Sequence, residues 1–310
     1  MILVSIIIPA YNSAQTIVAT LASALQQKSS LFNIEIIVIN DGSTDETALI
    51  LQDYQSDCTF ITQANQGTST ARQNGFNACK GNYIQYLDAD DLLAKSKIEL
   101  QLKALLANNA DIAYGDFEKF SEKNNQTTTE GLVEGLVLDD PEITIFKNFW
   151  RPPAAILYAR SIAEKLTWNN NLPVIQDARY LLDAVFMGGK LVYTPGVMAK
   201  YRINQAGSLS QRNSLSFVKD CFLNTSEVYH IWQNDLQNNP EKKSVLIESL
   251  RYCITEFSIN DQKLFHQAID LLLEIAPGYI PQKSTLIKRT SQVFGYRNAE
   301  KIASLKRKLI

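Results

Sequence analysis

Three carboxylates stand together at the end of one apolar run. The run covers residues 83–87, and Asp88, Asp90 and Asp91 follow it directly. Its length and aromatic content predict a buried strand. Carboxylates this close repel one another and lose hydration, so the sequence favours a divalent cation that holds them together. The alternative is a solvated acidic turn that merely caps the helix expected to begin near Ser96.

Short strands alternate with helices along the first part of the chain. Strands are expected at residues 4–8, 34–39, 58–62 and 83–87, with helices at 13–27, 47–55, 69–79 and 96–107. This alternation predicts a mostly parallel sheet, which binds ligands at the carboxyl ends of its strands. Asp41 and Asp90 both follow strands and so belong to that edge. No GxGxxG and no P-loop follows any strand, which argues against a Rossmann dinucleotide enzyme and a P-loop NTPase.

The later part of the chain has a looser pattern. We expect a strand at 111–114, an exposed hairpin or mobile loop at 119–134, a helix at 141–149, a strand at 154–158, a helix at 161–166, an amphipathic helix after Asp177, and strands at 191–194 and 197–203. From residue 214 onward the composition is helical. The sequence therefore predicts an α/β catalytic domain, residues 1–212, and an α-helical region, residues 213–310.

The bulk composition is that of a globular protein without a nucleic-acid partner. The chain has 310 residues, 45% of them hydrophobic, and a net charge of −2. Near neutrality gives no electrostatic reason to expect nucleic-acid binding. The cysteines are widely spaced, which suggests neither zinc nor a disulfide framework and fits a reducing cytoplasm. The apolar opening ends at Pro9 and is too short for a signal peptide or a spanning helix.

The end of the chain is strongly basic. Residues 288–310 contain Lys288, Arg289, Arg297, Lys301, Lys306, Arg307 and Lys308 against Glu300 alone. Such a tail can rest on an anionic membrane surface, which would place the protein at the inner face of the cell membrane. It can equally be the solvated face of a helix packed on the catalytic domain.

Several short motifs occur in a fixed order. They are Pro9-Ala10-Tyr11-Asn12, Asn40-Asp41-Gly42-Ser43-Thr44-Asp45, Ala71-Arg72, Gly75, Lys80-Gly81, Tyr83-Ile84, Leu87-Asp88-Ala89-Asp90-Asp91 and Asp177. In this combination the sequence resembles the family 2 glycosyltransferases over roughly residues 3–210. The resemblance implies the GT-A fold, a Rossmann-like, mostly parallel sheet flanked by helices. It also implies an enzyme of the hexosyltransferase type that transfers a sugar from a nucleotide diphosphate donor to an acceptor hydroxyl, normally with inversion.

The resemblance assigns the acidic motif to the donor and its metal. The family's metal motif falls on Asp88, Ala89 and Asp90, where Asp90 matches the direct ligand of Mn²⁺ or Mg²⁺ and Asp88 lies near the ribose and donor sugar. A divalent cation on the phosphates would stabilise the charge of the departing nucleoside diphosphate. For Asp91 we expect mainly a loop or capping role, and we expect it to be the most replaceable of the three acids.

Other matched positions are expected to bind the nucleotide. Pro9, Tyr11 and Asn12 fit the loop that wraps the nucleoside in the family, although Tyr11 can also be a packing aromatic. The aspartate matching Asp41 contacts the nucleobase there, and its alternative role is an N-cap of the next helix. Arg72 suits a contact with base or phosphate, or a surface ion pair.

The resemblance also marks later positions. Arg202 belongs to a segment, Tyr201-Arg202 with Gly207-Ser208, that resembles the family's closing segment, and it is expected near the diphosphate. Asn204 replaces the usual His of that segment.

Asp177 is the candidate general base. In-line attack requires a carboxylate that takes the proton of the acceptor hydroxyl. The family commonly has Glu-Asp here, and this chain has Gln176-Asp177, so the matching aspartate is present and its acidic neighbour is lost. An N-cap role for Asp177 competes. Gln73 is a further departure, because Asn often follows the Arg in the family.

The predicted function is a metal-dependent transferase of cell-surface polysaccharide synthesis that uses a UDP-sugar and a glycan or lipid-linked acceptor. A sugar-nucleotide nucleotidyltransferase is disfavoured, because Pro9-Ala10-Tyr11-Asn12 stands where that class has a Gly-rich basic loop. A non-catalytic module that binds nucleotide or carbohydrate is disfavoured, because Asp177 and the metal carboxylates are all present.

Overall fold

The chain folds as two units, Met1–Ser208 and Leu209–Ile310. The structure is a computed structural model that describes residues 1–123, 126–203, 214–282 and 285–307. The first unit contains β1 (Ile2–Ala10), α1 (Ile17–Leu25), β2 (Phe32–Asp41), α2 (Thr47–Gln52), β3 (Thr59–Gln63), α3 (Thr68–Ala78), β4 (Tyr83–Tyr86), β5 (Leu92–Leu93), α4 (Lys97–Asn108), β6 (Ile112–Lys123), β7 (Gln126–Val133), α5 (Pro141–Lys147), η1 (Pro153–Ala155), β8 (Ile156–Ala159), α6 (Arg160–Ala163), α7 (Gln176–Phe186) and β9 (Leu191–Arg202). The second contains α9 (Ser214–Trp232), α10 (Pro240–Asn260), α11 (Gln262–Ile275) and α12 (Thr285–Arg307).

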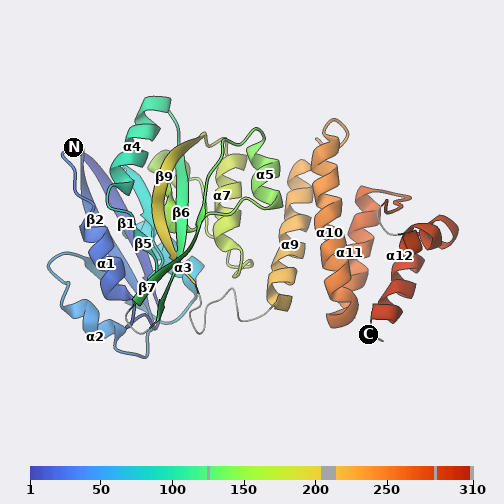
Figure 1. Ribbon diagram of the computed structural model, residues 1–310, viewed down its shortest axis with the longest axis horizontal. Coiled ribbons are helices and arrows are strands. Elements are labelled where there is room, and N and C mark those ends of the chain that lie inside the picture. The colour runs from blue at the N-terminus through green and yellow to red at the C-terminus, as the bar shows by residue number, and fades with distance from the viewer. Residues whose placement is uncertain (124–125, 204–213, 283–284, 308–310) are drawn as a thin grey trace. The chain divides into compact units, whose positions relative to one another are not determined.

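The strands described in the first unit form one sheet, in the order β3-β2-β1-β4-β8-β6-β9-β5, with β7 paired to β6 (Figure 1). Strands β1 to β4 are parallel, and so are β6 and β9. Strand β8 runs antiparallel between β4 and β6. The predicted fold class, a mostly parallel sheet flanked by helices with a helical C-terminal region, is confirmed.

The two faces of the sheet carry different helices. Alternate residues of a strand point to opposite faces. Ile6 and Ile8 of β1 join one buried cluster with α1 and α4. Ile7 points to the other face, where a Cβ added to Gly75 of α3 would overlap its side chain. Tyr86 pairs with Ile7 in register and packs on Tyr180 of α7, so α3 and α7 share that second face.

Several elements differ from the sequence-based expectation. Strand β1 continues through Pro9, which the sequence had marked as its end. The Ile7 carbonyl accepts from Leu87 N–H on the β4 side, and Pro9 faces the same side, so its missing N–H falls where the β1–β4 ladder ends while the pairing with β2 continues. The two strands expected at 191–194 and 197–203 are one strand, β9, with an irregular register opposite Asp116. The short strand β5 was not predicted.

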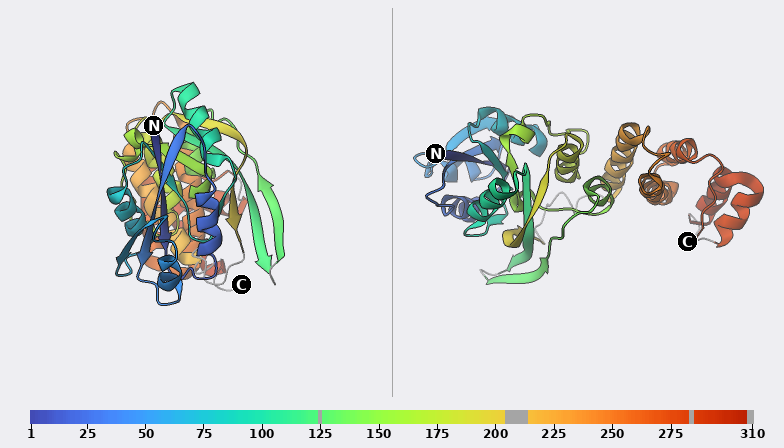
Figure 2. Two further views of the ribbon diagram at one scale, coloured as in Figure 1. Left: turned by 90° about the vertical axis from the view of Figure 1, so that its left-hand side faces the viewer. Right: turned by 90° about the horizontal axis from the view of Figure 1, so that it is seen from above.

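The polar segment after Lys119 is a hairpin of β6 and β7. Both views in Figure 2 show it extending beyond the neighbouring strands. Of the two alternatives offered for residues 119–134, the exposed hairpin is therefore correct for the residues that the structure describes.

The second unit is helical. Helix α12 is kinked at Gly295, whose φ of 77° lies in the left-handed region that glycine tolerates. Within the described ranges of the chain, no helix is long and apolar enough to cross a membrane.

Candidate functional site

The turn after β4 is held by hydrogen bonds from threonine side chains at the start of α1 to its backbone carbonyls. Asp91 N–H donates to the carbonyl of Asp88 at 3.1 Å. The hydroxyl groups of Thr16 and Thr20 both donate to the carbonyl of Ala89, at 2.8 and 3.0 Å, and Thr20 also reaches the carbonyl of Asp91 at 3.0 Å. Two threonines one helical turn apart therefore hold the acidic turn against the sheet.

Asp91 is the most buried acid of the turn. Its side chain is 1% exposed, and its Oδ1 accepts from Arg202 N–H at 2.9 Å. Burial, together with the charges of Asp90 and Asp88, raises the pKa of Asp91 well above its usual range. Asp91, directly before β5, thereby joins this turn to the end of β9, which argues against the expected replaceable loop role. The solvated capping turn is wrong as well, since α4 has Ser96 as its N-cap without a side-chain hydrogen bond.

Asp88 and Asp90 remain partly exposed. The Oδ1 of Asp88 forms an ion pair with the Arg72 guanidinium. Burial, and then the charge of Asp88, raise the pKa of Asp90 to about 6, while the charges of Arg202 and Arg72 oppose that rise. Two carboxylates that destabilise each other's charge form an electrostatic environment that favours a cation.

Arg72 is buried although it is charged. Its side chain is 3% exposed, its guanidinium carbon lies 4.5 Å from the centre of the Trp168 ring, and Asp88 is its ion-pair partner. The Nε and Nη1 atoms have no hydrogen-bond partner among the described residues. The alternative of a surface ion pair is therefore wrong, and the guanidinium keeps donors to offer to an anionic ligand.

Asp177 lies in the first turn of α7 and is half-buried. Its Oδ1 accepts from Ala178 N–H at 2.8 Å, and its Oδ2 accepts from the Trp150 indole N–H at 2.6 Å. Burial raises the pKa of Asp177, whereas the charge of Arg72 and the bond from Trp150 oppose that rise. Ile175, not Asp177, is the N-cap of α7, so the capping alternative is wrong.

Gln176 is a structural residue in this chain. Its side chain is 6% exposed, it accepts from the Ser69 hydroxyl, and it donates to the carbonyl of Pro173 at 3.0 Å. The amide that replaces the family's usual acid therefore ties the start of α7 to α3. Gln73, the other departure on α3, accepts from Trp168 N–H at 3.3 Å.

Arg202 connects β9 to the acidic turn. Its Nε donates to the carbonyl of Asp90 at 2.9 Å, and its Nη1 pairs with Glu122 of β6. The guanidinium also stacks on Phe120 at 4.5 Å. Asn204 and Gly207-Ser208, the rest of the predicted closing segment, lie outside the described residues.

Asp41 holds the loop that follows β3. Its Oδ1 accepts from Gln63 Nε2 at 2.8 Å and Gln66 N–H at 2.9 Å, and its Oδ2 accepts from Gly67 N–H at 2.9 Å. Asp41 is not the N-cap of α2; that position is Glu46, and Asp45 accepts from Thr47 N–H beside it. Because β1 separates β2 from β4, Asp41 lies roughly 10 Å across the sheet from the acidic turn.

The loop after β1 is bound to the loop after β2. Asn12 has a φ of 49°, in the left-handed region that Asn tolerates, and its Oδ1 accepts from Thr44 N–H at 2.8 Å. Asn12 N–H donates to the Ser43 hydroxyl at 3.1 Å. Pro9 is buried in β1, and Tyr11 is 46% exposed, so the tyrosine is available to a ligand.

Two aromatic residues of the site were not among the predicted site residues. Trp150 contacts Asp177, and its ring centre lies 5.1 Å from that of Tyr201. Burial raises the pKa of Tyr201 to about 12, and the charges of Asp91, Asp88, Asp90 and Asp177 add to the rise. Tyr201 therefore lies within electrostatic range of all four carboxylates, and only its position before Arg202 in the sequence pointed to it.

The carboxylates fit a cation that takes its other ligands from elsewhere. Within the described residues, no group of three or more His, Cys, Asp or Glu side chains is placed to hold a metal. Asp90 and Asp88 offer two carboxylates, which suits Mg²⁺ or Mn²⁺ in a site completed by water and substrate phosphates. Asp88 has one of its oxygens paired with Arg72, so Asp90 is the freer ligand.

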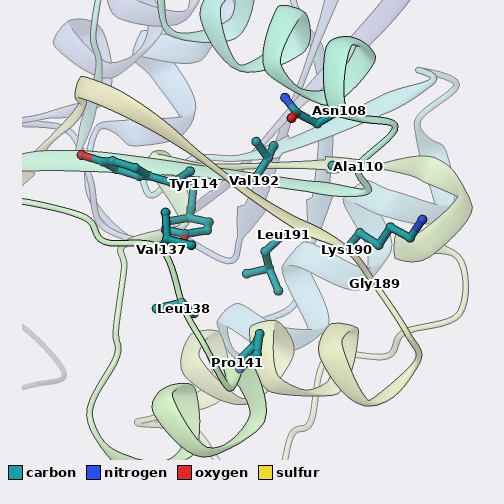
Figure 3. Close-up of a pocket in the computed structure, with 11 residues that line it drawn as sticks. Asn108, Ala110, Tyr114, Val137, Leu138, Pro141, Gly189, Lys190, Leu191 and Val192 are labelled. Carbon is teal, nitrogen blue, oxygen red and sulfur yellow. The ribbon is translucent and has the colours of Figure 1, made fainter.

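A separate pocket lies away from the acidic turn and Arg202. It has a volume of about 440 Å³ and is lined by residues of β6, β9, the end of α4 and the segment before α5, such as Tyr114, Val137 and Leu191 (Figure 3). Strand β9 covers roughly 30 Å between Tyr193, in this pocket, and Arg202. The pocket contains none of the predicted site residues.

Comparison with known proteins gives a family match. The model described as "Glycosyl transferase family 2" matches residues 5–166. Glycosyltransferase GlyA of Streptococcus pneumoniae is 30% identical over 67% of this chain and 31% of its own length. The uncharacterized glycosyltransferase EpsJ of Bacillus subtilis is 32% identical over 59% of this chain and 54% of its own. The chain thus spans about a third to a half of these relatives.

Solved structures share the fold. S. aureus TarS 1–349 in complex with UDP-GlcNAc has a TM-score of 0.66 at 15% identity, covering 99% of this chain and 92% of that one. The mannosyltransferase PcManGT from Pyrobaculum calidifontis, in complex with GDP-Man and Mn²⁺, has a TM-score of 0.53 at 15% identity, covering 99% and 86%.

Proposed function

Because this chain belongs to glycosyl transferase family 2, we propose that its first unit transfers a sugar from a nucleotide diphosphate sugar to an acceptor hydroxyl, with inversion. One observation carries the proposal. Arg72 forms an ion pair with Asp88, while its charge also acts on Asp90 and Asp177. The proposed donor-binding acids and the proposed base therefore all lie within electrostatic range of one buried cation.

The donor is proposed to lie along the carboxyl ends of β1, β2 and β4. Tyr11 and Asn12 contact the nucleoside, and Asp41 orients the loop beside the nucleobase or accepts from the base through its remaining lone pairs. Asp88 faces the ribose and donor sugar next to Ala89. Arg72 and Arg202 both contact the acidic turn, where they offset the charge of the diphosphate.

Asp90, assisted by Asp88, is proposed to hold Mn²⁺ or Mg²⁺. When bound, the ion would offset negative charge on the leaving nucleoside diphosphate. Asp177 takes the proton of the attacking hydroxyl, and its two hydrogen bonds fix the carboxylate while leaving lone pairs on both oxygens. Arg72 holds the Asp177 carboxyl closer to its ionised form.

We propose a UDP-sugar as donor and a glycan or glycolipid of the cell surface as acceptor. Support for the donor comes from TarS, whose structures are in complex with UDP and with UDP-GlcNAc. The basic face of α12 is proposed to bring the enzyme to the inner face of the cell membrane, where a lipid-linked acceptor would be found.

Nucleotide release tests the activity. The protein is incubated with Mn²⁺ and a panel of UDP-, GDP- and dTDP-sugars, and the released nucleoside diphosphate is measured. We expect UDP release, a loss of roughly 100-fold or more in Asp177→Asn, and a comparable loss in Asp90→Ala. Asp53→Asn, which changes an exposed aspartate at the end of α2, is the matched control and should keep full activity.

Three outcomes would contradict the proposal. Unchanged turnover in both Asp90→Ala and Asp177→Asn would show that Asp90 is not the metal ligand and that Asp177 is not the base. Release of pyrophosphate from a nucleoside triphosphate and a sugar phosphate would indicate a nucleotidyltransferase. Tight UDP binding in calorimetry with no transfer to any acceptor would indicate a binding module.

A further inference from the structure

The Trp150 indole donates one of the two hydrogen bonds that hold the Asp177 carboxylate. Its Nε1–H donates to Asp177 Oδ2 at 2.6 Å, a short distance for an N–H donor. Trp150 lies in the segment between α5 and η1, whereas Asp177 lies in the first turn of α7. The hydrogen bond therefore joins two segments that η1, β8 and α6 separate in the sequence.

The indole ring itself is held by other aromatic rings. Its centre lies 5.1 Å from that of Tyr201 and 5.7 Å from that of Phe117, both in edge-to-face contact. The next residue, Arg151, is 5% exposed and donates to the carbonyl of Glu134 at 2.6 Å. Arg151 also stacks on Phe149 at 4.4 Å. The ring therefore has few positions open to it.

A buried polar network fixes the other end of this segment. Lys97 Nζ donates to the carbonyl of Ile156 at 3.0 Å and to Gln85 Oε1. Gln85 Nε2 donates to the carbonyl of Pro153 at 3.1 Å, and Gln101 Nε2 donates to that of Ala155 at 2.8 Å. All three side chains are fully buried. Such groups are costly to bury unless they are paired, so they tie η1 to β4 and α4.

We propose that Trp150 is a positioning residue for the general base, which points the Asp177 carboxylate at the acceptor hydroxyl and favours its ionised form. The network of Gln85, Lys97 and Gln101 supports this role because it fixes the segment that carries the indole. The expected effect on kcat rests on the proposed function. The hydrogen bond itself can be tested without any reaction.

The charges around Asp177 set the sign of the effect. Burial raises its pKa most; Arg72 of α3, the Trp150 indole and Ala178 N–H lower it, and the charge of Asp88 raises it. The Tyr201 and Tyr158 phenols also lie within range of its charge. A base must be ionised to accept a proton, so activity falls as the pH drops through the pKa of Asp177. Loss of the indole donor raises that pKa and moves the acidic limb to higher pH.

Indole N–H resonances test the hydrogen bond directly. The chain has three tryptophans, so the spectrum should contain three indole signals, and the one missing in Trp150→Phe belongs to Trp150. We expect that signal to shift with pH as Asp177 ionises, and to lose this titration in Asp177→Asn. A signal that is equally pH-dependent in Asp177→Asn, or pH-independent in the unaltered protein, would overturn the proposal.

The pH profile of kcat tests the functional consequence. Trp150→Phe keeps an aromatic ring and removes the donor, so its acidic limb should move up by about one pH unit, with activity recovered above the limb. Simple misfolding would not be repaired by raising the pH. Trp232→Phe, which alters a buried tryptophan of α9, is the matched control and should leave the limb in place.

The outcomes separate this inference from the proposed function. An unmoved limb in Trp150→Phe, with activity lost in Asp177→Asn, would overturn the positioning role alone. Full turnover in Asp177→Asn would overturn the proposed base, and the indole titration would still report whether the hydrogen bond forms.

Discussion

Three neighbouring acids have three different environments in this protein. Asp88 is paired with Arg72, Asp90 is partly exposed with a pKa raised to about 6 by burial and by Asp88, and Asp91 is buried against the backbone of Arg202. Their chemistry is the same, so their different roles arise from what each side chain contacts. The acid with the least access to a ligand is the one that joins two strands of the sheet.

Asp91 should therefore be required for stability. In Asp91→Ala the buried N–H of Arg202 loses its acceptor, which costs about 1–3 kcal/mol of the free energy of unfolding. Asp91→Asn keeps an oxygen in that place and should lose less. Urea denaturation of the two variants checks this. Equal stability of Asp91→Ala and the unaltered protein would show that the bond contributes nothing.

Residue types and order predicted much of the site, and contacts between distant residues explain the rest. Asp88, Asp90 and Asp177 stand out because their motifs have a known order. The burial of Asp91 depends on Arg202, which is far away in the sequence, and nothing near Asp91 reveals it. Trp150 looked like any aromatic residue beside prolines. Only the fold shows that it reaches Asp177.

Helix α3 depends on close contact with the sheet. Gly75 faces β1 and β2, where an added Cβ would overlap the Ile7 side chain and lie 3.4 Å from Ile39. Both isoleucines are buried in central strands, so neither can move far. The same helix carries Arg72, so its distance from β1 also sets the position of the guanidinium relative to Asp88.

Gly75→Ala should weaken both the packing and the site. Overfilling a tight core contact costs about 1–3 kcal/mol, and a shifted α3 should also reduce nucleotide affinity. Asn77→Ala changes an exposed position on the same helix and is the control. Thermal denaturation and calorimetric titration with UDP measure the two effects. A Gly75→Ala protein as stable as the control would show that the contact relaxes without cost.

Most elements were predicted because strands buried on both faces and their helices have strong patterns. The two strands that were not predicted correctly, β9 and β5, differ for physical reasons. Strand β9 was predicted as two strands, but it continues through Gly196. The φ of 100° at Gly196 is accommodated by an irregular register with β6. Strand β5 has two residues, Leu92 and Leu93, and exists only because β9 pairs with it.

One face of α12 combines exposed apolar side chains with exposed lysines. Ile302 and Leu305 are 47% and 66% exposed, and the exposed Lys301 and Lys306 lie on either side of them at helical spacing. The only acid between residues 285 and 307 is Glu300, which is 2% exposed and paired with Arg307. An apolar strip flanked by lysines is the pattern on which we base the proposed contact with an anionic membrane surface.

This face should bind vesicles that contain phosphatidylserine and release them at high salt, because screening weakens the lysine contribution. Replacing both Ile302 and Leu305 with Asp removes the apolar contact and adds repulsion, so the bound fraction in flotation should fall by roughly tenfold or more. Ile231→Asp changes an equally exposed isoleucine of α9 and should bind as before. Equal binding of all three proteins, or equal binding to pure phosphatidylcholine, would instead mean that α12 presents an ordinary solvated face.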